Sequence, residues 1–166
     1  MSSTGSLEMA RVPKNLVIVG GGIIGLEIGS IWRRLGANVQ VIELLDRIGG
    51  MGLDSEISRE FQKLLEKQGL KFHLGQSFKS ATKKGDSSII IEATKKSDPS
   101  SKVSFDADKL LVCIGRRPNT AEIFDESIKC DGLVDKRGFI QIKKDFSTPI
   151  SKCFSYRFPK KIINLS

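Results

Sequence analysis

The sequence has little of what marks metal-binding, secreted or membrane-spanning proteins. Its three cysteines, Cys113, Cys130 and Cys153, stand far apart without a CxxC pair, which indicates neither a zinc site nor a local redox pair. No run approaches the roughly 18 apolar residues of a membrane span. The segment MSSTGSLEMARVPK also lacks the continuous apolar core of a secretory signal. We therefore expect one soluble, intracellular domain without a metal site.

The net charge of +8 raises nucleic acid as a partner, but the distribution of the charge argues against it. Half of the excess comes from residues 151–166, which contain basic residues and no acid. The remaining lysine pairs stand in or beside expected turns, without the interleaved aromatic residues of a single-strand binder. We expect neither a nucleic acid nor a membrane as partner.

A strand, a helix and a second strand follow one another between residues 15 and 43. The apolar run 15–19, NLVIV, predicts a buried strand, and residues 38–43, NVQVIE, alternate as a strand does. Between them, apolar residues at helical spacing predict a helix over 23–35, closed by Gly36. This order is typical of the βαβ unit of a parallel sheet. The stripe of the helix consists of Ile24, Ile28, Ile31 and Leu35.

The rest of the chain predicts a second helix, further strands and an insertion. Asp54 suits the N-cap of a helix that ends at Gly69, and a strand follows at 70–74, in which His73 points away from the core as a surface residue. Short strands between 78 and 108, separated by turn residues, predict an antiparallel meander. Residues 109–115 and 138–142 predict two more strands. The fold class is therefore α/β, a Rossmann-like βαβ parallel sheet with an antiparallel β-meander insertion. The residues expected on the inner face of the second helix are Ile57, Phe61, Leu64 and Leu65.

Residues 20–25, GGGIIG, match the pattern G-x-G-x-x-G, and we call them the glycine finger. A strand precedes the finger, a helix follows it and an acid ends the next strand, which is the context of a dinucleotide site. Gly20 permits the tight turn, Gly22 lets a pyrophosphate approach the backbone, and Gly25 lets the helix pack on the strand. The N-H groups and the dipole of the helix would hold the negative charge. The alternative is a glycine-rich turn without a ligand.

Two acids flank this site. Glu43 ends the second strand 18 residues after Gly25, where a carboxylate can accept both hydroxyls of an adenosine ribose and repel a 2′-phosphate, which favours NAD over NADP. Otherwise Glu43 is an ordinary strand-end acid. Arg47 would suit NADP, but a surface ion pair with Asp46 is the better interpretation. Glu27 either interacts with the helix dipole or contacts the nicotinamide ribose, and the sequence does not choose between them.

Three segments together resemble the NAD-binding domain of the dihydrolipoamide dehydrogenases, which are flavin-dependent pyridine-nucleotide disulfide oxidoreductases. These are VIVGGGIIGLEIGS, VIELLDRIGGMGLDSEISREFQKLLEKQG and LLVCIGRRPNT, and the likeness runs from about Ser3 to Ser155. The resemblance implies that Glu43 binds the adenosine ribose, that Phe78 flanks the adenine and that Gly115 lies against the nicotinamide end. It also implies that Ile23 gates nicotinamide access to the flavin. The finger residues that it implies to contact the pyrophosphate and the nicotinamide half are Gly20, Gly21, Gly22, Ile23, Ile24, Gly25, Leu26 and Glu27.

The resemblance covers one domain of a larger flavoenzyme. The family pattern also includes an earlier glycine finger for FAD, a cysteine pair and a C-terminal dimer domain with a His-Glu base, and none of these occurs in this sequence. We expect residues 1–155 to be an NAD-binding domain without catalytic residues, inactive alone and unable to bind FAD. Its expected partners are NAD or NADH and the missing FAD and dimerisation domains, and it would be a monomer or associate weakly. The expected compartment is the mitochondrial matrix or another organelle, or the cytoplasm of a bacterium.

Residues 156–166, YRFPKKIINLS, depart from the family pattern, as in a truncated gene product. Pro159 removes a backbone donor and the neighbouring positive charges repel one another, so we expect a mobile or loosely laid tail that contributes little stability. The alternative is that its apolar residues cover a face left by missing domains. The second candidate function is accordingly a non-catalytic interaction module.

Overall fold

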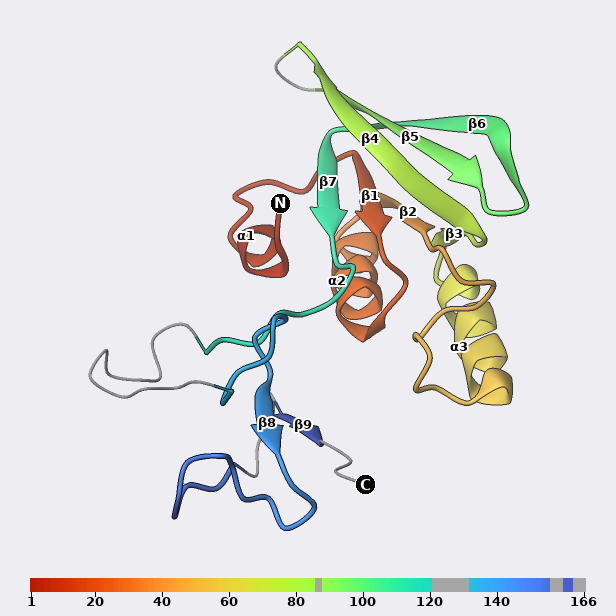
Figure 1. The fold of residues 1–166 in the computed structure, drawn as a ribbon. Coiled ribbons are helices and arrows are strands. Elements are labelled where there is room, and N and C mark those ends of the chain that lie inside the picture. Colours follow the sequence, from red (N-terminus) through yellow and green to blue (C-terminus); the bar gives the residue numbers. More distant parts are fainter. Residues whose placement is uncertain (86–87, 121–131, 156–159, 163–166) are drawn as a thin grey trace. The chain divides into compact units, whose positions relative to one another are not determined.

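The computed structural model describes residues 1–85, 88–120, 132–155 and 160–162, in two compact units, Met1–Gly115 and Arg116–Ser166 (Figure 1). Each unit is described by itself below. No helix among the described residues is long and apolar enough to cross a membrane. The assignment of residues 1–155 to one nucleotide-binding domain, with 156–166 as a tail, stays a prediction.

A four-stranded parallel sheet forms the centre of the first unit, in the order β3-β2-β1-β7. Its strands are β1 (Asn15–Val19), β2 (Asn38–Ile42), β3 (Lys71–His73) and β7 (Lys109–Val112). Helices connect β1 to β2 and β2 to β3, whereas a separate sheet stands between β3 and β7 in the chain. The predicted α/β class and the βαβ unit are confirmed.

Both faces of β1 are buried, which explains its continuous apolar sequence. Leu16 and Ile18 pack into one core with the helical side chains, whereas Val17 and Val19 pack into a second core with the antiparallel sheet. Successive side chains of a strand point to opposite faces, so one strand supplies both cores. The parallel sheet is therefore the middle layer of the first unit, with helix on one face and the β-meander on the other (Figure 1).

The helix α2 (Ile23–Arg34) follows β1 and turns its glycines toward the sheet. The predicted stripe is only partly right, because Ile28 is buried and Ile24 packs against the core, but Ile31 and Leu35 are about half exposed. A Cβ atom at Gly29 would lie 2.9 Å from Cδ1 of Ile18, so a larger residue there would require the Ile18 side chain to shift. The buried residues are Gly25, Leu26, Ile28, Gly29 and Trp32.

The helix α3 (Ser55–Lys67) begins as predicted at Asp54, whose Oδ1 accepts the N-H of Glu56 at 2.8 Å. These backbone hydrogen bonds lower the pKa of the Asp54 carboxyl. The predicted inner face is only partly right. Leu65 is buried, but Ile57 and Leu64 are 57% and 55% exposed, because the buried position of the first turn is taken by Ser58.

The predicted meander is an antiparallel sheet of β4 (Gln76–Lys84), β5 (Ser88–Lys95) and β6 (Asp98–Ala107). The register between β4 and β5 shifts between Phe78 and Ser80, which places a bulge beside Phe78. Ile91, Ala93, Phe105 and Ala107 of this sheet fill the second core. The insertion therefore covers one face of the parallel sheet.

A short helix that the sequence analysis did not predict, α1 (Ser3–Leu7), precedes β1. The backbone of Met1 pairs with β7, because its amino group donates to the carbonyl oxygen of Leu110 at 2.8 Å and its carbonyl accepts the N-H of Val112 at 3.1 Å. Ser6 is buried in this helix and donates to the carbonyl oxygen of Ser3 at 2.6 Å. Five residues without apolar periodicity give no helical signal in the sequence.

The second unit contains β8 (Ile140–Ile142) and β9 (Lys160–Ile162), which pair in parallel. Leu133, Ile140 and Ile142 form its small core. Residues 160–162, which the sequence analysis placed in a loose tail, form the strand β9 beside β8. The small contribution of the tail to stability stays a prediction. The remaining tail residues, 156–159 and 163–166, lie outside the described residues.

His73 does not lie at the surface as predicted. It is half-buried between the two sheets, where its Nε2 lies 3.0 Å from Oε1 of Gln40 and its ring meets that of Phe105 edge-on at 4.6 Å. Its side chain points away from the helical core, but the antiparallel sheet covers that face as well. Burial, with a smaller contribution from the charge of Lys71, lowers the pKa of His73.

We predict that the chain loses stability as the pH falls below about 6.5, the ordinary pKa of histidine. Between that value and the lowered pKa of folded His73, the unfolded chain binds a proton that the folded chain does not bind. The contribution of neutral His73 to the free energy of unfolding is therefore complete above about pH 6.5 and is lost as the pH falls toward the lowered pKa. Urea unfolding at pH 7.5, 6.5 and 5.5 measures the effect. His73→Gln is the control, because His73 is the only histidine and the carboxyl contributions remain. Equal pH dependence of both proteins would contradict the prediction.

Candidate functional site

The glycine finger lies at the carboxyl end of β1, beside the ends of β2 and β7. The N-H of Gly20 donates to the carbonyl oxygen of Ile42 at 2.8 Å, and the N-H of Cys113 donates to that of Val19 at 2.8 Å. Gly20 has φ of 106°, and a Cβ atom there would overlap the carbonyl oxygen of Cys113. Only glycine therefore allows β1 to turn here while β7 passes at backbone distance.

Gly25 and Gly22 differ in their surroundings. A Cβ atom at Gly25 would overlap the carbonyl oxygen of Gly20 and would lie 3.2 Å from Cγ2 of Ile18, so Gly25 is where the helix packs on the turn and the strand. A Cβ atom at Gly22 would meet nothing within 4 Å. No protein atom therefore requires a glycine at position 22. A glycine in such a place is typical of a backbone that a ligand approaches closely.

The N-terminus of α2 carries donors without intrahelical acceptors. Gly22 is the N-cap and supplies no side-chain cap, and the first helical hydrogen bond runs from Leu26 to the carbonyl oxygen of Gly22 at 3.1 Å. The N-H groups of residues 22–25 therefore have no i−4 carbonyl to donate to. Together with the helix dipole, they provide a site that favours an anion.

The carboxylate of Glu43 accepts hydrogen bonds from the finger and from the loop that follows β2. Its Oε2 accepts the N-H of Gly21 at 2.5 Å, and its Oε1 accepts the N-H of Leu45 at 2.8 Å. The side chain also packs on the Cα of Gly21, where a Cβ atom would lie 3.2–3.3 Å from Glu43 atoms. The predicted ribose ligand is therefore preorganised beside the finger.

The other predicted site residues lie in different settings. Glu27 is exposed on α2, Ile23 is half-exposed at the start of that helix, and Ile24 is partly buried. Leu26 is buried in the helical core, which makes it a packing residue. Phe78 is half-buried against the second core, and Gly115 follows β7 in an exposed position with φ of 138°. The structure brings Gly20–Gly25 and Glu43 together and does not by itself assign a role to the others.

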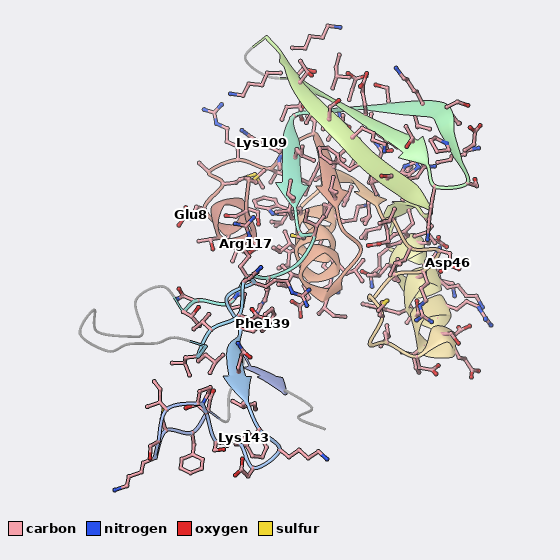
Figure 2. The ribbon with its side chains drawn as sticks, viewed as in Figure 1. Glu8, Asp46, Lys109, Arg117, Phe139 and Lys143 are labelled. Carbon is pink, nitrogen blue, oxygen red and sulfur yellow. The ribbon has the colours of Figure 1, made fainter. Side chains whose placement is uncertain are left out.

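The expected ion pair between Asp46 and Arg47 is absent from the described residues. Figure 2 shows the side chain of Asp46 in the loop between β2 and α3. This loop, residues 44–53, contributes to the site through its backbone, which the sequence analysis did not anticipate. The N-H of Gly49 donates to the carbonyl oxygen of Gly21 at 2.8 Å, and Ser58 donates to that of Ile48 at 2.7 Å. The paired glycines of DRIGGMG were the available signal.

The model of the family described as "Pyridine nucleotide-disulphide oxidoreductase" matches residues 1–155. The chain belongs to this family. Mitochondrial dihydrolipoyl dehydrogenases from Rattus norvegicus and Homo sapiens are each 43% identical to the chain over 155 residues, which are 93% of the chain and 30% of each relative. The chain therefore spans about a third of the length of these family members. The predicted resemblance is confirmed.

Solved structures of flavoprotein oxidoreductases share the fold. The HOCl-induced flavoprotein disulfide reductase RclA from Escherichia coli is 25% identical with a TM-score of 0.69, over 90% of the chain and 32% of that protein. The water-forming NADH oxidase from Lactobacillus brevis, bound to NADH, is 23% identical with a TM-score of 0.68, over 87% and 29% respectively. At that identity the second likeness concerns the fold alone.

We predict different losses of stability for two alanine substitutions in the finger. Gly25→Ala forces backbone apart and is expected to destabilise the fold by about 1–3 kcal/mol. Gly22→Ala meets open space and has extended backbone, so it should cost less than about 1 kcal/mol. Chemical denaturation of both variants measures this difference. A larger loss for Gly22→Ala would contradict the packing role assigned to Gly25.

Proposed function

We propose that this chain binds NAD or NADH at the glycine finger, as the nucleotide-binding domain of a dihydrolipoamide dehydrogenase-like oxidoreductase. The observation that carries the proposal is the open space at Gly22 next to the preorganised carboxylate of Glu43. An anion-binding helix end and a ribose acceptor belong to two parts of one dinucleotide. The identity to dihydrolipoyl dehydrogenases supports the choice of enzyme.

The pyrophosphate would accept the free N-H groups of residues 22–25, at the place where no side chain intervenes. The carboxylate of Glu43 would bind the adenosine ribose. Each of its oxygens already accepts one backbone N-H and retains capacity for another donor, such as a ribose hydroxyl. The same carboxylate would repel a 2′-phosphate, which favours NAD over NADP.

The remaining site residues extend this proposal along the nucleotide. Phe78 would flank the adenine, whereas Ile23, Glu27 and Gly115 would face the nicotinamide half. Exposure of Glu27 and Ile23 at the beginning of α2 supports their access to a ligand. Gly21, Ile24 and Leu26 would act by shaping the finger.

In a complete enzyme, flavin and a disulfide would carry the redox chemistry by which dihydrolipoamide is reoxidised, and this domain would position the nicotinamide. The FAD-binding domain and the dimerisation domain of that enzyme are then the partners of this chain. We propose that the chain alone binds NAD without catalysis. The mitochondrial relatives support the mitochondrial matrix as the compartment of a eukaryotic enzyme.

The decisive experiment is titration with NADH and NADPH of the unchanged chain and Glu43→Gln. We expect NADH to bind more tightly to the unchanged chain. Glu43→Gln should weaken NADH binding by about 10- to 100-fold, because hydrogen bonds to a charged group contribute about 1.5–3 kcal/mol. The affinity ratio of NADPH to NADH should rise, because the repelling charge is gone while both nucleotides share the pyrophosphate site.

Asp46→Asn is the matched control, since it removes one negative charge from the adjoining loop (Figure 2). We expect it to leave the affinity ratio unchanged. Calorimetry or NADH fluorescence measures both variants. No binding of NADH at millimolar concentration would refute the proposed function, and an unchanged ratio in Glu43→Gln would refute the role of Glu43.

A second candidate function is an interaction module, favoured by the exposed apolar side chains of Ile57 and Leu64. They stand seven residues apart and so lie on one side of α3. Light scattering after size-exclusion chromatography tests this alternative. Association that Ile57→Ser and Leu64→Ser abolish would support it, and a monomer at high concentration would count against it.

A further inference from the structure

We propose that Ser58, in the first turn of α3, is a positioning residue for the dinucleotide site. The inference rests on the proposed function and extends it beyond the finger and Glu43. Ser58 is only 1% exposed, and its Oγ donates to the carbonyl oxygen of Ile48 at 2.7 Å. This buried hydrogen bond connects α3 to the loop at the peptide group between Ile48 and Gly49.

That peptide group also touches the finger. The N-H on the same peptide plane belongs to Gly49 and donates to the carbonyl oxygen of Gly21 at 2.8 Å. In a trans peptide the carbonyl and the N-H point in opposite directions, so one plane connects Ser58 on one side to Gly21 on the other. Gly49 has φ of 83°, and a Cβ atom there would overlap the side chain of Leu53, so this conformation requires glycine.

The connection continues to the anion site. The Gly21 carbonyl shares its peptide plane with the N-H of Gly22, the first free donor at the beginning of α2. Glu43 holds the preceding plane through the Gly21 N-H. The Gly21 carbonyl, by contrast, depends on Gly49 and hence on Ser58. Ser58 therefore orients a donor to the pyrophosphate that it does not itself touch.

The test compares Ser58→Ala with Ser6→Ala in the full chain. Ser6 is equally buried and its hydroxyl also donates to a backbone carbonyl, at 2.6 Å, but it lies in α1 and forms no bond to the finger. The two variants thus remove the same kind of bond. We expect Ser58→Ala to raise the dissociation constant of NADH by about 3- to 10-fold more than Ser6→Ala does.

A second readout does not depend on nucleotide. Amide hydrogen exchange of Gly49, followed by NMR, should accelerate in Ser58→Ala and stay unchanged in Ser6→Ala. Ser58→Cys, which keeps a weaker donor of similar size, should lie between serine and alanine in both measurements. This graded variant keeps the test informative should Ser58→Ala fold poorly.

The outcomes separate the two proposals. If the unchanged chain binds no NADH, the proposed function is overturned. Faster exchange of the Gly49 amide in Ser58→Ala would then still support the connection from Ser58 through Gly49 to Gly21. Binding of NADH with equal loss in Ser58→Ala and Ser6→Ala overturns the positioning role and leaves the proposed function standing. Unchanged Gly49 exchange in Ser58→Ala overturns the role as well.

Discussion

The structure of the first unit depends on one steric constraint, the close approach of three backbones at the carboxyl end of β1. The turn at Gly20 passes the carbonyl of Cys113, and the first turn of α2 passes the carbonyl of Gly20. Neither contact leaves space for a Cβ atom. Because the backbones meet here, α2 packs closely on the sheet, and its N-terminus lies at the edge where the strands end.

The same constraint joins the fold to the candidate site. Gly25 and Gly29 serve packing, whereas Gly22 meets no protein atom and leaves the helix N-terminus accessible. Glu43 and Gly49 then bind both polar groups of Gly21, so the finger is fixed by these two hydrogen bonds as well as by its own turn. A site of this kind binds an anion through backbone groups whose directions are set before the ligand arrives.

The sequence analysis succeeded where a structural element follows from the residues within the element itself. The apolar run 15–19, the N-cap at Asp54 and the turn-separated strands of the meander each follow from local rules, and each was found in place. It failed where burial depends on what lies opposite. Ile57 and Leu64 have helical spacing but are more than half exposed, and Ser58 takes the buried position instead. His73 points away from the helical core as predicted, yet a second sheet covers it.

The sequence by itself determined the finger and the acid at 43, because spacing along one strand, one helix and the next strand carries that information. It determined the family through the resemblance of three longer segments. Only the tertiary structure showed what each glycine meets, because the backbone of Cys113 that passes Gly20 comes from a distant part of the chain. It also decided that residues 160–162 pair with β8 and that one peptide of the loop 44–53 connects Ser58 to Gly21. Backbone hydrogen bonds of this kind leave little trace in side-chain identity, because every residue except proline offers the same donor and acceptor.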